Sequence, residues 1–427
     1  MASKFSPTTA TSVVIANMIG TGVFTSLGFQ LLEFTSPTLI LMLWALGGVL
    51  ALTGAMTYAE LGAALPRNGG EYHFLSELAH PAAGFVSGWV SATIGFAAPI
   101  ALAAMTFASY LAAIIPGLPK TWVAAGLIVL VGMVHAVRRS TSGQFQVLFT
   151  TIKVVLVIGF SVAALIWAQT PQTLDWSLTS ADLELTLTAG FAVSLIYVNY
   201  AYTGWNAATY LAGELDDAQR NLPKVLIFGT GVVMVLYVLL NGVFLAVAPV
   251  EEMAGKVEVG HVAAVHAFGE LAGNGFAAVL AVLLVSTVSA MVMAGPRVLQ
   301  VIGEDFPALR ALSTTNRDDI PVRAIVLLCA IAIVLVFTAA FDAILVFTGF
   351  TLALNTFATV ASVFVLRKRG DARPFSMPWF PLPPIIFLTI TGWTMIYLVM
   401  ERPVEALWTL GIIVVGLGMY AASRQRH

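Results

Sequence analysis

Long apolar segments follow one another along this chain from end to end, and they constrain its fold more than any other feature. A helix needs about 20 apolar residues to cross a bilayer, and we count about twelve such segments. They lie at about residues 11–32, 38–65, 82–115, 121–138, 145–168, 185–212, 224–248, 262–296, 322–341, 343–366, 383–400 and 404–422. Only 10% of the residues are charged, against about 25% in soluble domains. The sequence therefore predicts an all-α integral membrane protein that forms a single transmembrane domain over residues 1–427.

The basic residues indicate how the chain is oriented in the membrane. If the N-terminus lies in the cytoplasm, all but four of the 20 lysines and arginines fall in inner loops or at inner ends of the spans. Lys120, Lys256 and Arg402 then lie outside, and Lys153 lies within a span. Because cytoplasmic loops carry an excess of Lys and Arg, we expect a multi-pass protein of the cytoplasmic cell membrane with both termini inside.

Small and polar residues interrupt two of the apolar segments near mid-membrane. The first segment reads IGTGV at residues 19–23, and the sixth reads YTGWN at 202–206. A broken helix is tolerated in the membrane where it lines a cavity, and two such breaks in corresponding segments indicate an inverted repeat with its binding site at the interface. We therefore predict two five-span repeats, at about 11–168 and 185–366, followed by two extra helices at about 383–422. The alternative is that the glycines only permit close helix packing.

Six motifs in order along the chain resemble those of the amino acid–polyamine–organocation (APC) superfamily. They are GTG at 20–22, YAELG at 58–62, PRNGGEY at 66–72, YTGWN at 202–206, NLPK at 221–224 and RPF at 373–375. In these motifs the chain is similar to the amino-acid permeases of that superfamily, including bacterial L-type and cationic-type transporters. The resemblance implies a LeuT-type fold of about 12 helices with discontinuous first and sixth helices, and a function in amino acid transport.

The two breaks offer chemistry that suits an amino acid. Free N–H groups at a half-helix N-terminus attract a carboxylate, and carbonyls freed by the breaks can accept from an ammonium. The N–H groups expected to bind the carboxylate belong to Thr21, Gly22 and Val23, and the carbonyls expected to be unpaired belong to Ile19, Tyr200, Ala201 and Thr203. Asn206 and Ser286 complete the predicted substrate-binding set.

The resemblance also implies gates on both sides of this site. Tyr200 corresponds to the aromatic gate that closes over the substrate from outside, and Trp205 resembles a residue that lines or braces the pocket. The alternative for Trp205 is ordinary helix packing. Glu60 ends the second span, and we expect it to support the inner gate together with Arg67.

Lys153 is an ionisable residue deep in the fifth span. At about 1.5 Å per residue it lies roughly 14 Å into a core about 30 Å thick, where a charged group indicates function. The resemblance places it where sodium-coupled relatives hold a sodium ion. We expect its ammonium to replace that ion by donating to carbonyls near Ala16 and to the Ser289 hydroxyl, which predicts sodium independence. A buried lysine can also lose its proton, so protons are a candidate coupling ion.

Together these features predict a secondary active transporter of small to medium neutral L-amino acids that works by alternating access, either as an exchanger or coupled to protons. A polyamine or cationic amino acid transporter is the alternative, although Glu33 is the only acid near the predicted site. The chain has no paired catalytic groups, so we expect no enzyme activity. We also expect no metal, cofactor or nucleic acid, and a monomer or weak oligomer in the lipid bilayer.

Overall fold

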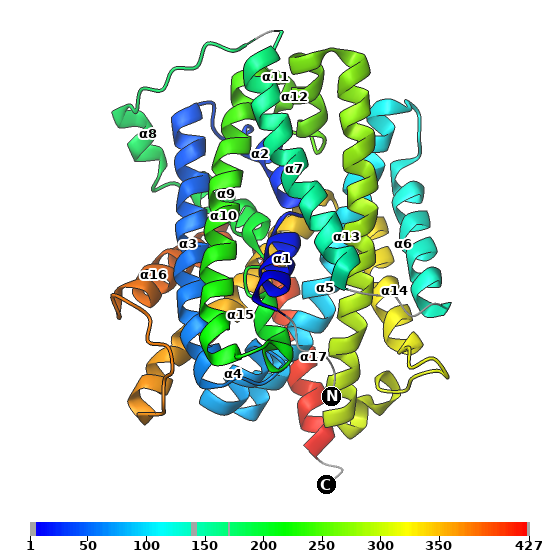
Figure 1. Ribbon diagram of the computed structural model, residues 1–427, viewed down its shortest axis with the longest axis vertical. Coiled ribbons are helices and arrows are strands. Elements are labelled where there is room, and N and C mark those ends of the chain that lie inside the picture. Colours follow the sequence, from blue (N-terminus) through cyan, green and yellow to red (C-terminus); the bar gives the residue numbers. More distant parts are fainter. Residues whose placement is uncertain (1–5, 138–142, 170, 425–427) are drawn as a thin grey trace.

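The computed structural model describes residues 6–137, 143–169 and 171–424, and the described chain consists of helices and their connections (Figure 1). Within these residues, ten segments are long and apolar enough to cross a membrane. They are α1 and α2 taken together (Pro7–Met18 and Gly22–Gln30), α3 (Pro37–Ala64), α5 (Pro81–Ile114), α6 (Lys120–Val137), α7 (Gly143–Trp167), α10 (Ala218–Val247), α13 (Glu270–Asp305), α15 (Phe341–Arg369), α16 (Leu382–Glu401) and α17 (Pro403–Arg424). The chain is therefore an all-α, multi-pass membrane protein.

Two of the predicted spans are shorter than a full crossing helix. The sixth is divided into α9 (Ala189–Tyr202) and the 3₁₀ helix η1 (Ala207–Glu214), and the ninth is α14 (Val322–Thr338). The described residues also form short helices outside the spans. These are α4 (Glu71–Leu78), α8 (Ser180–Leu185), α11 (Val250–Met253), α12 (Val259–Phe268) and η2 (Pro307–Leu312).

Several predicted span bounds differ from those of the structure; the seventh span, for example, begins at Ala218 and not near 224, and the physical cause is plain for two others. The eighth span was expected at 262–296, but Gly269, with φ of 84°, separates α12 from α13, so the span begins at Glu270 and continues to Asp305. A glycine in this conformation ends a helix without a steric penalty. The sixth span was expected from residue 185, but Thr188 caps α9 by accepting from Phe191 N, so this helix begins at Ala189.

The buried apolar side chains divide the helices into two groups. One core joins α1 and α2, α3, α9 and α10, the first, second, sixth and seventh spans. A second core joins α5, α6, α13 and α14, the third, fourth, eighth and ninth spans. Within each group the helices pack along one another, α3 on α10 and α5 on α13. The two groups are in contact: the first core includes Leu280 and Leu284 of α13, and a third core joins α9 to α5 and α15.

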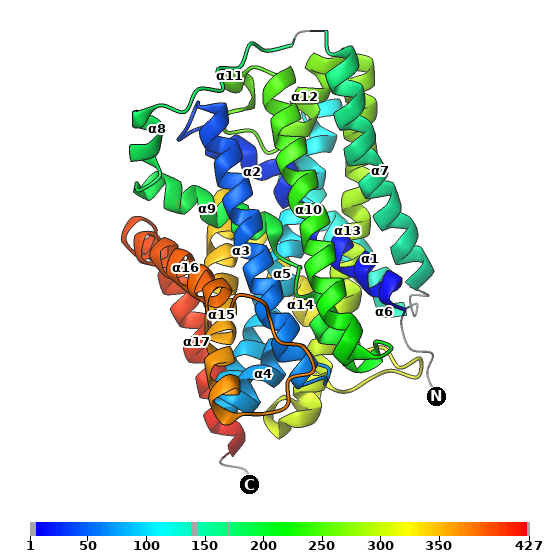
Figure 2. The same cartoon turned by 60° about the vertical axis from the view of Figure 1, so that its left-hand side comes forward.

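The periphery of the bundle is apolar. Exposed hydrophobic side chains follow one another on α6, at Val129, Leu130, Met133 and Val134, and recur on the outward faces of α16 and α17. The last two helices lie at the outer edge beside α15 (Figure 2). Large exposed apolar surfaces of this kind are compatible with a lipid surrounding.

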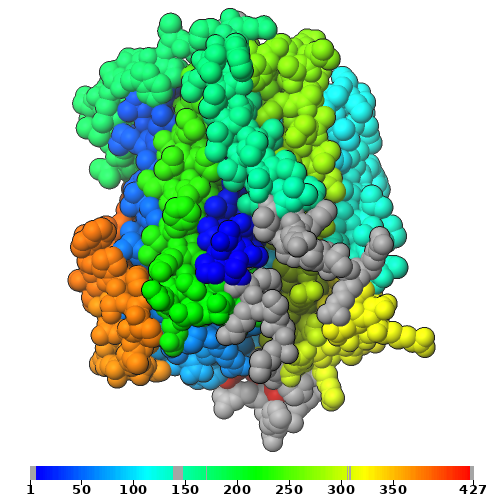
Figure 3. Space-filling model, in the orientation of Figure 1, coloured from blue at the N-terminus to red at the C-terminus, as the bar shows by residue number. Residues whose placement is uncertain are grey.

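The two ends of the bundle carry different connections. Figure 1 shows α8, α11 and α12 at one end and α4 at the other, together with the C-terminal end of α17. The first half-helix, α1, reaches the surface between α7 and α10 (Figure 3). Four residues of the basic set assigned to the inner side, Lys4, Arg138, Arg139 and Arg426, lie outside the described residues.

Candidate functional site

The first break leaves amide groups free at the start of a half-helix. Ile19 ends α1, Gly20 N donates to Met18 O at 2.7 Å, and Phe24 N donates to Thr21 O at 3.0 Å. In the described part of the chain, the N–H groups of Thr21, Gly22 and Val23 have no backbone acceptor. Free N–H groups at the positive end of a helix dipole can attract an anion such as a carboxylate.

The second break lies directly against the first. Thr203 ends α9, and its hydroxyl and its amide both donate to Tyr200 O. Gly204 follows with φ of 103°, and a Cβ there would lie 2.8 Å from the carbonyl carbon of Asn17. A Cβ on Gly22 would lie only 2.4 Å from Ala201 Cα, much closer than van der Waals contact allows. The two half-helix junctions therefore touch backbone to backbone.

Most carbonyls of the breaks already accept a hydrogen bond, so the prediction that they are unpaired was wrong for three of the four. Ile19 O accepts from Lys153 Nζ at 3.0 Å, Ala201 O accepts from the Tyr237 hydroxyl at 3.2 Å, and Tyr200 O accepts from Thr203. Each carbonyl has a second lone pair, so a substrate ammonium would share these oxygens with protein donors.

Tyr237 was missed as a residue of this site. It lies in α10, fully buried, and its hydroxyl is within hydrogen-bond distance of Met18 O at the first break and of Ala201 O at the second, so its one proton can be donated to either carbonyl. A tyrosine in the middle of an apolar span needs a partner for its hydroxyl. This requirement could have drawn attention to Tyr237 in the sequence, but it does not show which backbone carbonyls accept from the hydroxyl.

Lys153 lies where the fifth span meets the first break. Its ammonium is 7% exposed and donates to Ile19 O at 3.0 Å and to Thr287 Oγ1 of α13 at 3.1 Å. The predicted partners near Ala16 and at Ser289 were wrong. Ala16 lies inside α1, and Ser289 Oγ is 2.8 Å from His135 Nε2. Residues 287 and 289 point about 200° apart around a helix, so only one of them can face Lys153.

The predicted outer gate spans the two breaks. The Tyr200 hydroxyl lies 3.4 Å from Thr21 Oγ1, and the Tyr200 ring is buried. Trp205 packs instead on α3, with its ring 4.7 Å from that of Tyr58. Asn206 Nδ2 donates to Glu71 Oε1 at 3.1 Å, and Ser286 Oγ donates within its own helix to Leu283 O at 2.7 Å. The described contacts of these last three residues are with the protein itself, and their predicted roles at the substrate remain predictions.

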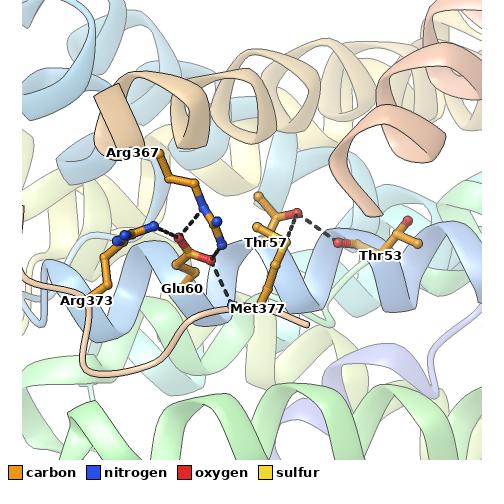
Figure 4. Close-up of polar contacts among 6 residues, drawn as sticks. All are labelled: Thr53, Thr57, Glu60, Arg367, Arg373 and Met377. Carbon is orange, nitrogen blue, oxygen red and sulfur yellow. Dashed lines mark hydrogen bonds and ion pairs between the residues drawn. The ribbon is translucent and has the colours of Figure 1, made fainter. Parts of the chain in front are cut away.

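Glu60 forms a buried ion pair near the end of α3, but its partner is not the predicted one. Its carboxylate accepts from Arg367 Nε at 2.8 Å and Nη2 at 2.6 Å, and from Met377 N at 2.8 Å, while Arg373 Nη1 lies 3.6 Å away (Figure 4). Arg67 follows the end of α3 and is exposed, so it does not reach this pair. The bidentate Glu60–Arg367 pair connects α3 to α15.

We expect Glu60→Gln to lower the free energy of unfolding by about 3 kcal/mol, because it leaves the Arg367 charge partly buried and without its counter-ion. Unfolding by SDS titration in mixed micelles measures this change. Arg373→Gln is the matched control. Its pair is longer and its side chain is 31% exposed, so it should cost at most about 1 kcal/mol. Equal losses in the two variants would contradict the assignment.

The chain is similar to known proteins over almost its whole length. Residues 5–420 match the family described as amino acid permease. It is 26% identical to the b(0,+)-type amino acid transporter 1 of Mus musculus, over 96% of this chain and 85% of that protein. It is 28% identical to the serine/threonine exchanger SteT of Bacillus subtilis (strain 168), over 88% and 86% of the two chains. It is also 26% identical to the large neutral amino acids transporter small subunit 2 of Rattus norvegicus, over 96% and 79%.

Proposed function

Because the chain belongs to the amino acid permease family and is thereby an amino acid transporter, we propose that it carries small to medium neutral L-amino acids without sodium, by exchange or with protons. In this proposal the N–H groups of Thr21, Gly22 and Val23 bind the carboxylate. The ammonium shares the carbonyl oxygens of Ile19, Tyr200, Ala201 and Thr203. The observation that carries the proposal is the contact between the two breaks, with Lys153 beside them.

The charges at the breaks support the neutral substrate class. The side chains of Thr21, Tyr200 and Thr203 are uncharged, and Lys153 already uses its ammonium on protein oxygens. Glu33 lies at the far end of α9, where a Cβ on Gly190 would be 2.8 Å from its carboxylate. A cationic side chain or a polyamine would therefore lack a counter-ion at the two breaks. The names of two relatives, a serine/threonine exchanger and a large neutral amino acids transporter, support the neutral class.

The position of Lys153 supports sodium independence in this proposal. Its ammonium fills the space between the first break and α13, and it makes the contacts to a backbone carbonyl and a hydroxyl that a sodium ion would make there. The Lys153 ammonium thus supplies the positive charge that a sodium ion would otherwise bring to this position. The same group can exchange a proton, which is how protons enter the proposal as a coupling ion.

We further propose that transport proceeds by alternating access between the two packing groups. The group of α1, α2, α3, α9 and α10 would rock against the group of α5, α6, α13 and α14, with Tyr200 closing the outer side. The two five-span repeats and the monomeric or weakly oligomeric state remain predictions. The excess of Lys and Arg at one end supports a cytoplasmic cell membrane location with both termini inside.

Competition for uptake into proteoliposomes tests the substrate class. A tracer of radiolabelled L-serine should be displaced by excess unlabelled L-alanine, L-threonine or L-leucine. Excess L-lysine, L-arginine or putrescine should leave its uptake unchanged. Displacement by the cationic compounds alone would instead favour the polyamine or cationic alternative.

A further inference from the structure

Glu71 is a buried carboxylate on the inner side of the bundle, and the substrate site described above gives it no role. It is the first residue of α4 and is 3% exposed. In the described part of the chain no lysine, arginine or histidine forms an ion pair with it. A buried carboxylate without a counter-ion needs hydrogen-bond donors for its lone pairs.

Five neutral donors converge on this carboxylate from four different elements. Oε1 accepts from the Tyr58 hydroxyl at 2.6 Å and from Asn206 Nδ2 at 3.1 Å. Oε2 accepts from Ser91 Oγ at 3.3 Å, from the Tyr210 hydroxyl at 3.4 Å, and from Asn355 Nδ2. An ionised carboxylate accepts from every one of these donors, whereas a protonated one offers fewer acceptor sites.

The donors belong to both packing groups. Tyr58 lies on α3, and Asn206 and Tyr210 lie at and in η1, the inner half of the sixth span. Ser91 lies on α5 in the opposite group, and Asn355 lies on α15. Relative movement of the two groups at this level must therefore break hydrogen bonds to Glu71.

The residues just before Glu71 hold the same half-helix. Asn68 Oδ1 accepts from Gly213 N at 2.7 Å, and Asn68 Nδ2 lies 3.5 Å from Glu214 Oε1. A Cβ on Gly70 would lie 2.9 Å from Thr209 Oγ1, and Thr209 is fully buried. The segment 66–72 thus covers η1 from one end to the other.

We propose that Glu71 is the latch of the inner gate: its carboxylate holds η1 against α3, α5 and α15, and the inner side opens when Asn206 and Tyr210 leave it. This inference rests on the proposed function in one respect: opening of the inner side is a step of the proposed transport cycle. Glu71 is a positioning residue, because its described contacts are with protein side chains, among them Asn206 at the end of the second break, and not with the N–H groups and carbonyls proposed to bind the substrate.

Accessibility of Thr209 reports whether the latch is closed. The chain has a single cysteine, Cys329, so Cys329→Ala provides a cysteine-free background into which Thr209→Cys is introduced. In this parent, the buried thiol should react slowly with N-ethylmaleimide. Adding Glu71→Gln keeps the shape of the side chain but replaces one acceptor with a donor and removes the charge. We expect the labelling rate to rise about tenfold or more, because hydrogen bonds to charged groups are the strong ones.

Two further variants distinguish a latch from a general loss of structure. Glu77→Gln makes the same chemical change on an exposed residue of α4 and should leave the labelling rate unchanged. Tyr210→Phe removes one donor and should raise the rate about two- to fivefold, a smaller effect than that of Glu71→Gln. When both changes are combined, the effect should be less than the product of the two, because they break the same interaction.

The pH dependence of labelling gives a separate readout. Burial raises the pKa of the Glu71 carboxyl, so this group takes up a proton at a higher pH than an ordinary glutamate. Labelling in the parent, divided by that in the Glu71→Gln protein at each pH, should therefore rise as the pH falls. The titratable groups that face Glu71 are the phenols of Tyr58 and Tyr210, while α5 and α15 present only Ser91 and Asn355.

Other titratable groups near α4 are common to the parent and the variant, so they cancel in this ratio. They are His73 and Glu77 on α4 and Arg67 before it. The latch is refuted if folded Glu71→Gln protein, eluting as a single size-exclusion peak, labels at the parent rate. If that variant does not fold, an unchanged rate in Tyr210→Phe refutes it equally. No substrate is needed, so failure of the proposed transport function would leave this result intact.

Discussion

Lys153→Ala is expected to reduce amino acid uptake by about a hundredfold or more while the protein still inserts into the membrane. The ammonium donates to Ile19 O and Thr287 Oγ1, and two hydrogen bonds from a charged donor contribute about 3–6 kcal/mol together. Each ~1.4 kcal/mol corresponds to tenfold in a population. Without these bonds the Ile19 carbonyl is buried and lacks its donor, and the first break loses its fixed position beside α13. Initial uptake rates in proteoliposomes measure the loss.

The control for this prediction is Lys120→Ala, the same substitution at an exposed position at the start of α6. It should transport at the parent rate. Thr287→Val removes one of the two acceptors and leaves the charge, so its loss should be smaller than that of Lys153→Ala. Parent-like uptake by Lys153→Ala at every pH tested would refute the role of this residue in transport.

Gly22→Ala is expected to abolish measurable transport, which makes it the second large effect. The added methyl group would lie 2.4 Å from Ala201 Cα and 2.7 Å from Ala201 Cβ, and neither atom is the end of a flexible side chain. Inserting one methyl group into a packed region costs about 1–3 kcal/mol, and more where backbone must move. The two breaks would separate, and the N–H groups at the first would no longer face the carbonyls at the second.

Gly20→Ala is the matched control, two residues away in the same motif. A Cβ there would find its nearest neighbour, Met18 O, at 3.8 Å, which is ordinary contact. We expect this variant to keep transport within about twofold of the parent, because no packed atom has to move. If both variants transport equally well, or if Gly20→Ala is the more damaging, contact between the two breaks is not what the motif provides.

Much of the fold was predictable because membrane helices are specified by length and apolar composition. The interruptions were predictable as well, because close helix packing alone does not explain why glycine and threonine occur together in both the first and the sixth span. The error at Gly269 shows the limit. Residues 262–296 are mostly apolar, and hydropathy alone does not show that one glycine adopts φ of 84° and divides α12 from α13.

The site was predictable where backbone geometry decides it and not where side-chain partners do. Breaks at residues 19–21 and 203–206 follow from local sequence. The partner of Glu60 is Arg367, more than 300 positions away, and several arginines were equally placed in the sequence. In the sequence, Glu71 stands out only as part of the PRNGGEY motif at 66–72, where it follows two glycines. Three of its five donors lie more than 130 positions away, so its burial could not be predicted from its neighbours in the sequence.

Counterflow in sodium-free buffer tests the central claim most directly. Proteoliposomes preloaded with unlabelled L-serine are placed in choline buffer containing radiolabelled L-serine, with protein-free liposomes as the control. We expect the label to accumulate transiently above the control, and to do so at the same initial rate when sodium replaces choline. No accumulation in either buffer, or accumulation only in the sodium buffer, would contradict it.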